Sequence, residues 1–273
     1  MKKLIAMLLA LVMVLALAAC TPAEKTPGTT AATNATTEAT TAATEEATEG
    51  TTQPAGEVMT YEQYAAAELK TPVVIESCIQ AVESWWDGVM NLYLQDEVGA
   101  YYVYKLACTE EESKALVPGV TVRISGYKDA WSGEVEIIDA TYEIIEGAEP
   151  VKVEATDATK VFGSDMLADL MNYKVLFQGL TVAASKDANG NEAAFLYKWD
   201  GSGQQGDDLY FNVSLGETTY TFTVNAYMVG TGADSEVYKA VEALHVGDKI
   251  DVEGFLYWYE GAQTHVTAVK AAA

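Results

Sequence analysis

The stretch VEGFLYWYEG at residues 252–261 repeats a pattern already present in ISGYKDAWSG at residues 124–133. Both stretches place a glycine, an aromatic residue, a second aromatic residue and another glycine at the same spacing, 128 positions apart (252 − 124). Around them, residues 115–141 align with 243–269 without a gap, and alternating apolar residues coincide. Such a fixed offset indicates a duplicated domain. The aligned glycines are Gly119 with Gly247, Gly126 with Gly254, and Gly133 with Gly261.

Each copy is predicted to contain three strands, a helix and two further strands, because apolar runs of strand length are separated by turn residues and capping boxes. The first copy opens with a helix over residues 60–69. In the first copy we expect strands at 73–82, 89–95, 101–106, 120–127 and 134–145, with a helix from Thr109 to about 119. In the second copy we expect strands at 174–184, 193–198, 208–226, 249–257 and 263–270, with helices at 164–171 and 235–244.

Five strands with one helix between the third and the fourth resemble the OB-fold, a small Greek-key barrel. The resemblance covers residues 58–148 and 149–273 as two tandem domains, the second enlarged by an insertion at about 185–210. The predicted pair of domains is similar to the OB-like domains of exported bacterial lipoproteins. We therefore predict an all-β fold with short helices, built from two five-stranded barrels. Two packed β-sandwich domains are the alternative.

The repeated glycines have a specific meaning in such a barrel. Strongly coiled strands use glycine where bending leaves no room for a side chain. We expect Gly126 and Gly254 at a bend of the fourth strand, and Gly133 and Gly261 in the turn that leads into the fifth.

The N-terminus has the features of a secretory signal peptide, predicted over residues 1–19. Lys2 and Lys3 precede an apolar run from Leu4 to Leu17, which is shorter than the roughly 20 residues that a membrane-spanning helix needs. Residues 17–20, Leu-Ala-Ala-Cys, resemble the lipobox of bacterial lipoproteins. The resemblance implies cleavage before Cys20 and a diacylglycerol on its sulfur, an anchor in the outer face of the cell membrane. An ordinary cleaved signal with an incidental cysteine is the alternative.

Residues 20–57 are predicted to form a disordered tether. Nearly all of them from Thr21 onward are Thr, Ala, Glu, Gly or Pro, and such a segment buries too little apolar surface to offset the entropy of ordering. A flexible coil of this length spans roughly 30–35 Å. That reach would suit a thick cell wall, so we expect a Gram-positive source.

The charge of residues 58–273 bears on the partner. Six of the 40 acidic residues and three of the 16 basic residues precede residue 58, which leaves 34 and 13, a formal charge of −21. Affinity for nucleic acid comes largely from Lys and Arg that displace counterions, so this balance disfavours nucleic acid as the partner. It is compatible with neutral glycans, peptides or cations.

The candidate ligand-binding residues are aromatic. In OB-folds, ligands lie across strands two and three, framed by the loop between strands one and two and the loop between strands four and five. Flat aromatic rings there can stack on sugars, bases or peptide side chains. The alternative is that some rings close the barrel end or pack against the other copy, and adjacent Trp85 and Trp86 cannot both point outward. The first-domain candidates are Trp85, Trp86, Tyr101, Tyr102, Tyr104 and Trp131, and the less favoured second-domain candidates are Trp199, Tyr257, Trp258 and Tyr259.

The sequence offers no cofactor site and no catalytic motif. Asp187, Asn189 and Asn191 vaguely resemble a calcium loop but lack EF-hand spacing, and Asn189-Gly190 is a hairpin turn signal. There is no G-x-S-x-G, H-E-x-x-H or P-loop motif, and the chain has only two histidines. Cys78 is expected on the first strand and Cys108 just after the third, and these strands are not neighbours, which leaves a disulfide between the two cysteines as the less favoured possibility.

The sequence as a whole predicts a lipid-anchored surface protein that binds a glycan or a peptide without altering it chemically. Three alternatives remain open. They are a single-stranded nucleic-acid-binding protein, a scaffold for protein assembly at the cell surface, and a hydrolase.

Overall fold

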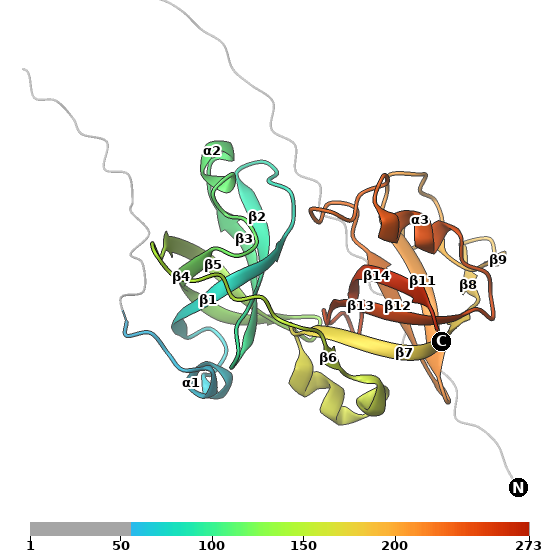
Figure 1. The fold of residues 1–273 in the computed structure, drawn as a ribbon, viewed down its shortest axis with the longest axis horizontal. Coiled ribbons are helices and arrows are strands. Elements are labelled where there is room, and N and C mark those ends of the chain that lie inside the picture. Colours follow the sequence, from blue (N-terminus) through green and yellow to red (C-terminus); the bar gives the residue numbers. More distant parts are fainter. Residues whose placement is uncertain (1–55, 273) are drawn as a thin grey trace, which may run out of the picture. The chain divides into compact units, whose positions relative to one another are not determined.

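A computed structural model of the chain describes residues 56–272 and shows two five-stranded barrels (Figure 1). The predicted signal peptide, Cys20 and nearly all of the predicted tether lie outside the described residues. Within residues 56–272, no helix is both long and apolar enough to span a bilayer.

The first barrel is closed, with its strands in the order β1-β2-β3-β5-β4. All pairings are antiparallel except the one between β3 and β5. Short helices α1 (Tyr61–Ala66) and α2 (Glu110–Ser113) both begin at the predicted capping boxes, in which Thr60 and Thr109 accept hydrogen bonds from backbone N–H groups. The strands are β1 (Pro72–Val82), β2 (Val89–Gln95), β3 (Ala100–Ala107), β4 (Thr121–Trp131) and β5 (Glu134–Ile144).

The second barrel repeats the strand order of the first. Its strands follow one another as β11-β12-β14-β13-β7, and an additional pairing between β11 and β7 closes the ring. Helix α3 (Glu236–Glu242) lies between the third and fourth strands of this barrel. Both barrels therefore have the OB-fold order 1-2-3-5-4, which confirms the predicted fold class. The strands are β7 (Lys174–Ala183), β11 (Leu209–Leu215), β12 (Thr218–Val224), β13 (Lys249–Phe255) and β14 (His265–Ala271).

Two predicted strands of the second copy were wrong, at residues 208–226 and 193–198. Residues 208–226 form a hairpin of two strands rather than one, because Gly216 adopts a left-handed φ of 61° and turns the chain. The helix predicted at residues 164–171 is present as a 3₁₀ helix, η2 (Asp165–Leu170), and the Ser164 hydroxyl before it donates to the carbonyl of Val161.

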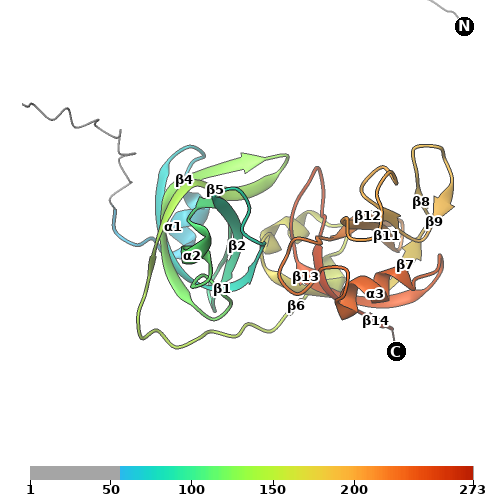
Figure 2. The same cartoon turned by 90° about the horizontal axis from the view of Figure 1, so that it is seen from above.

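The insertion lies between the first and second strands of the second barrel, and Figure 2 shows its β8–β9 hairpin projecting from that barrel. Residues 193–198, expected as a strand of the barrel, contribute only the short strand β10 within this insertion. The minor elements are β6 (Thr156–Asp157), η1 (Thr159–Val161), β8 (Ser185–Lys186), β9 (Glu192–Ala193) and β10 (Leu196–Tyr197).

The repeated glycines occupy equivalent places in the two barrels. A Cβ added to Gly126 would lie 2.7 Å from Ile137 Cγ2, and one added to Gly254 would lie 2.3 Å from the carbonyl oxygen of His265. The pairing of the fourth strand with the fifth shifts register next to each of these glycines. The turns that follow contain two successive positive φ angles, at Ser132 and Gly133 and again at Glu260 and Gly261. The predicted roles of all four glycines are confirmed.

Each barrel has its own apolar core, and a third cluster joins them. In this third cluster Tyr93 and Tyr102 of the first barrel pack with Met228 and Phe255 of the second. Hydrogen bonds also cross the junction, including Lys174 N–H to Gln95 Oε1 at 2.7 Å. Cys78 and Cys108 are buried and both are free thiols.

Candidate binding site

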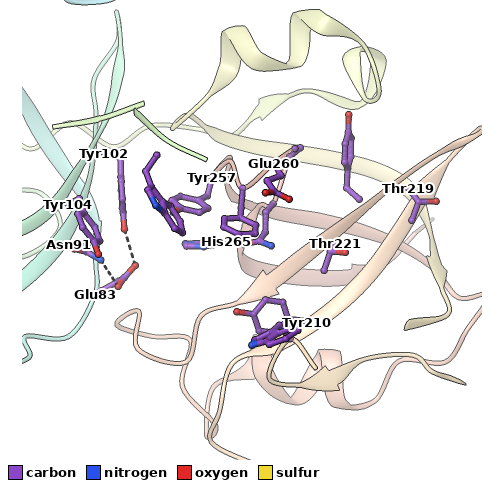
Figure 3. Close-up of a pocket in the computed structure, with 17 residues that line it drawn as sticks. Glu83, Asn91, Tyr102, Tyr104, Tyr210, Thr219, Thr221, Tyr257, Glu260 and His265 are labelled. Atoms are coloured by element: carbon purple, nitrogen blue, oxygen red, sulfur yellow. Dashed lines mark hydrogen bonds between the residues drawn. The ribbon is translucent and has the colours of Figure 1, made fainter. Parts of the chain in front are cut away.

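A cleft of about 790 Å³ lies between the two barrels and is lined by both (Figure 3). Its volume is within the range of small-molecule sites, about 300–1,000 Å³. The first barrel contributes Glu83, Asn91, Tyr102, Tyr104 and Trp131. The second contributes Trp199, Tyr210, Thr219, Tyr220, Thr221, Tyr257, Tyr259, Glu260, Gly261, Ala262, Gln263 and His265.

The second barrel supplies the face on which OB-folds usually bind ligands. Tyr210 comes from β11, while Thr219 and Thr221 come from β12, so strands two and three of this barrel line the cleft. The loop between β13 and β14, residues 256–264, and the insertion that carries Trp199 frame these strands. This arrangement matches the general OB-fold site.

The corresponding face of the first barrel is largely covered by the second barrel. The Tyr93 ring stacks on Phe255, with centroids 4.7 Å apart, and its hydroxyl hydrogen-bonds to Nδ1 of His265 at 2.9 Å. Tyr102 meets Tyr257 edge to face at 5.5 Å. The part of this face that borders the cleft carries Asn91, Tyr102 and Tyr104.

The predicted aromatic residues divide between several places. Tyr102, Tyr104, Trp131, Trp199, Tyr257 and Tyr259 line the cleft. The rings of Trp131 and Tyr259, one from each barrel, lie 5.3 Å apart. The structure thus combines candidates from both copies in one site, where the sequence had assigned them to two.

The remaining candidates lie elsewhere. Tyr101 is buried in the first core, 4.8 Å from the ring of Tyr64, and Trp85 is half-buried with its Nε1–H bonded to the carbonyl of Cys108. Trp258 packs over Gly133, where an added Cβ would lie 2.6 Å from its Cδ1. Trp86 is exposed beside a neighbouring pocket. The three indoles of the first copy therefore do not share one cleft.

Several residues of the cleft were not identified from the sequence. Tyr210 lies between the buried Leu209 and Phe211 of β11. Thr219 and Thr221 are exposed and alternate with less exposed residues of β12, and this period-2 pattern could have placed all three outward once the hairpin was recognised. His265 and Glu83 gave no such signal, because they reach the cleft only through the docking of the barrels.

The charged side chains of the cleft are acidic, Glu83 and Glu260, among aromatic rings and neutral polar groups. None of its lining residues is Lys or Arg. The Glu83 carboxylate accepts a hydrogen bond from Asn91 Nδ2 at 2.8 Å, and burial raises its pKa. Burial lowers the pKa of His265 to about 3, so this imidazole is neutral and stacks on Tyr257 with centroids 4.5 Å apart.

The loop considered for calcium binding uses its carboxylate internally. Asp187 Oδ1 accepts hydrogen bonds from the backbone N–H groups of Asn189 and Asn191, both at 2.8 Å. No group of three or more His, Cys, Asp or Glu side chains suited to a metal ion occurs within the described part of the chain.

Comparison with protein-family models and with curated protein sequences finds no match. Among solved structures, the chain is similar to the hypothetical protein ygiW from E. coli, at 23% identity over 34% of this chain and 94% of that one, with a TM-score of 0.26. It is also similar to a murine DNA-binding protein bound to double-stranded DNA, at 14% identity over 74% of this chain and 100% of that one, with a TM-score of 0.35.

A third similar structure is the single-stranded DNA-binding protein from Thermus aquaticus, at 13% identity over 75% of this chain and 96% of that one, with a TM-score of 0.23. At such identities and scores, none of these similarities bears on what this chain binds. The strand order and the cleft together describe a protein of two docked OB-fold barrels with one site between them.

Proposed function

We propose that this protein binds a neutral glycan chain in the cleft between its barrels and does not change it chemically. The observation that carries the proposal is a cleft walled by aromatic rings, threonine hydroxyls, amides and carboxylates, with no Lys or Arg among its lining residues. Aromatic faces stack on the apolar faces of sugar rings, and OB-folds as a class bind oligosaccharides on this surface.

The rings that a glycan would meet are exposed in the unliganded chain. Trp131, Trp199 and Tyr259 are 55%, 68% and 43% exposed. Thr219, Thr221 and Gln263 offer donors and acceptors that suit sugar hydroxyls. A peptide is the less suited ligand, because extended peptides usually add to a free sheet edge and a closed barrel has none.

A single-stranded nucleic acid is the second candidate, because aromatic rings stack on bases as well as on sugars. A single-stranded oligonucleotide is therefore one arm of the test. The formal charge of −21 and the cleft residues Glu83 and Glu260 would repel a phosphate backbone, however.

The proposal places this site outside the cell, on a tether held by a lipid at Cys20. Its support is the signal-like apolar run, the lipobox-like residues 17–20 and the Thr-rich segment that follows. In a Gram-positive host fed an alkyne-labelled fatty acid, the wild-type chain should carry the label and remain with the membrane. The Cys20→Ala variant should lose the label, and a labelled variant would contradict the anchor.

The ligand class can be tested by calorimetry on the full chain against neutral glycans, peptides and an oligothymidine. Glycan binding should be nearly unchanged between low and high salt, whereas nucleic-acid binding falls steeply. Trp199→Ala should weaken binding, and the matched control Met166→Ala, which truncates another exposed apolar side chain, should not. Salt-sensitive oligothymidine binding without glycan binding would refute the proposal, and capture of a protein partner alone would favour the scaffold.

A further inference from the structure

A second pocket, of about 380 Å³, adjoins the main cleft. The two cavities share Glu83, Asn91 and Tyr104 in their linings. Figure 3 places these three residues together at one end of the main cleft, with Thr219 at the opposite end. The second pocket thus continues the cleft beyond Glu83.

The second pocket carries two exposed aromatic rings on fixed backbone. Trp86 is 78% exposed and Tyr227, from the other barrel, is 60% exposed. The backbone N–H of Trp86 donates to the carbonyl of Val89 at 2.9 Å, and the N–H of Val89 donates back at 3.0 Å. The carbonyl of Tyr227 accepts from the N–H of Ser84 at 2.7 Å. The rings contribute little to the cores, yet the backbone from which each one projects is held by these hydrogen bonds.

The boundary between the two cavities is also rigid. Asn91 donates through Nδ2 to Glu83 at 2.8 Å and accepts at Oδ1 from the backbone N–H of Lys105 at 2.7 Å. Lys105 holds a φ of 51°, and its ammonium lies 5.0 Å from the centroid of the Tyr104 ring. These contacts fix a polar edge between the two cavities. A glycan chain could pass over this edge from the rings of the main cleft to Trp86 and Tyr227.

We infer that the Trp86–Tyr227 pocket is a second subsite for the glycan of the main cleft, so that the ligand is an oligomer rather than a mono- or disaccharide. The inference rests on the proposed function. A chain that stacks on Trp199 and Tyr259 and extends past Glu83 reaches this pocket without leaving the continuous lining of the two cavities. Because the backbone of both residues is already ordered, binding costs only the side-chain entropy of the two rings, which favours their use as stacking platforms.

The test is calorimetry on the full chain with two probe series, β-1,4-linked N-acetylglucosamine and β-1,4-linked glucose, each from dimer to hexamer. Affinity should rise with chain length. Trp86→Ala should weaken hexamer binding by about tenfold, or about 1.4 kcal/mol, and leave dimer binding unchanged. Trp86→Phe should retain most of the hexamer affinity, Trp199→Ala should weaken both lengths, and Met166→Ala should weaken neither.

Equal affinity of the wild-type chain for dimer and hexamer, or hexamer binding that is unaffected by Trp86→Ala, would overturn the second subsite and leave the main cleft intact. If the wild-type chain binds neither series, the inference falls together with the proposed glycan function. Unchanged melting temperatures of the variants would exclude misfolding as the cause of a loss, since Trp86 is exposed.

Discussion

Replacing Gly254 by alanine should destabilise the second barrel strongly, because the new methyl group has no space. A Cβ at this position would lie 2.3 Å from the carbonyl oxygen and 2.9 Å from the carbonyl carbon of His265, both backbone atoms of the neighbouring strand β14. A relaxed carbon-to-oxygen contact needs about 3.3 Å, so β14 would have to move by about 1 Å.

That movement has consequences beyond one contact. The side chain of His265 bonds to Tyr93 across the barrel junction, and β14 is hydrogen-bonded to both β12 and β13. Overpacking in a dense interior costs about 1–3 kcal/mol, and we expect a value near the upper end, about 3 kcal/mol. For a folded region of this size, such a loss lowers the melting temperature by about 6–12 °C.

The measurement is urea denaturation of the wild-type chain and of Gly254→Ala, Gly126→Ala and Gly232→Ala. Gly126→Ala should cost less, since the nearest backbone atom, the carbonyl oxygen of Ile138, lies 2.8 Å from the added Cβ rather than 2.3 Å, and the Ile137 methyl group at 2.7 Å can adjust. Gly232 has ordinary space, 3.5 Å to the carbonyl of Ala226, and its replacement should be neutral or slightly stabilising. A loss below about 0.5 kcal/mol for Gly254→Ala would refute the steric explanation of the repeated glycines.

Three further outcomes are expected from denaturation experiments. Burial and the nearby Asp129 raise the pKa of Glu136 from 4.5 to about 7. Between these pH values the folded chain keeps a proton that the unfolded chain releases, so the free energy of unfolding falls as pH rises from 4.5 to 7. Glu136→Gln should remove about 3 kcal/mol of this fall, and curves for variant and wild type that stay parallel between pH 5 and 8 would contradict it. Lys128→Met should lower the free energy of unfolding by about 2–3 kcal/mol, because the Lys128 ammonium donates hydrogen bonds to the carbonyls of Tyr64, Ala65 and Ala67 at the end of α1. A variant as stable as the wild type would contradict that role. Tyr93→Phe should cost about 1–2 kcal/mol by leaving His265 Nδ1 unpaired in the junction, and an unchanged urea midpoint would show that this bond is dispensable.

The sequence predicted the barrel strands where local patterns define them. The two-residue turn at Asp87 and Gly88, with φ angles of 47° and 87°, reverses the chain between the bridged residues Trp86 and Val89 and leads into β2, as its residue types indicate. The hairpin of β11 and β12 was missed because both strands are rich in β-branched and aromatic residues, and Gly216 alone is a weak turn signal between them. Local signals of this kind fix strands and turns but not every strand boundary.

The candidate site could be predicted only in its residue types. Trp131, Trp199 and Tyr259 follow from loop positions, yet their meeting in one cleft depends on the docking of the barrels. The hydrogen bond between Tyr93 and His265 joins residues 172 positions apart, and no periodicity encodes such a contact. Tyr102 illustrates the same limit, since the strand pattern gives its face but not the Tyr257 ring that covers it.

The hairpins that join the fourth and fifth strands of the two barrels are hydrogen-bonded to each other. The N–H of Glu260 donates to the carbonyl of Ser132 at 2.8 Å, and the N–H of Trp258 donates to the Glu134 carboxyl at 2.7 Å. Since each barrel supplies one wall of the cleft, the site is complete only when the two barrels are associated. Ligand binding and barrel association are therefore thermodynamically linked. A ligand that contacts both barrels stabilises their association by the same free energy by which that association strengthens its own binding.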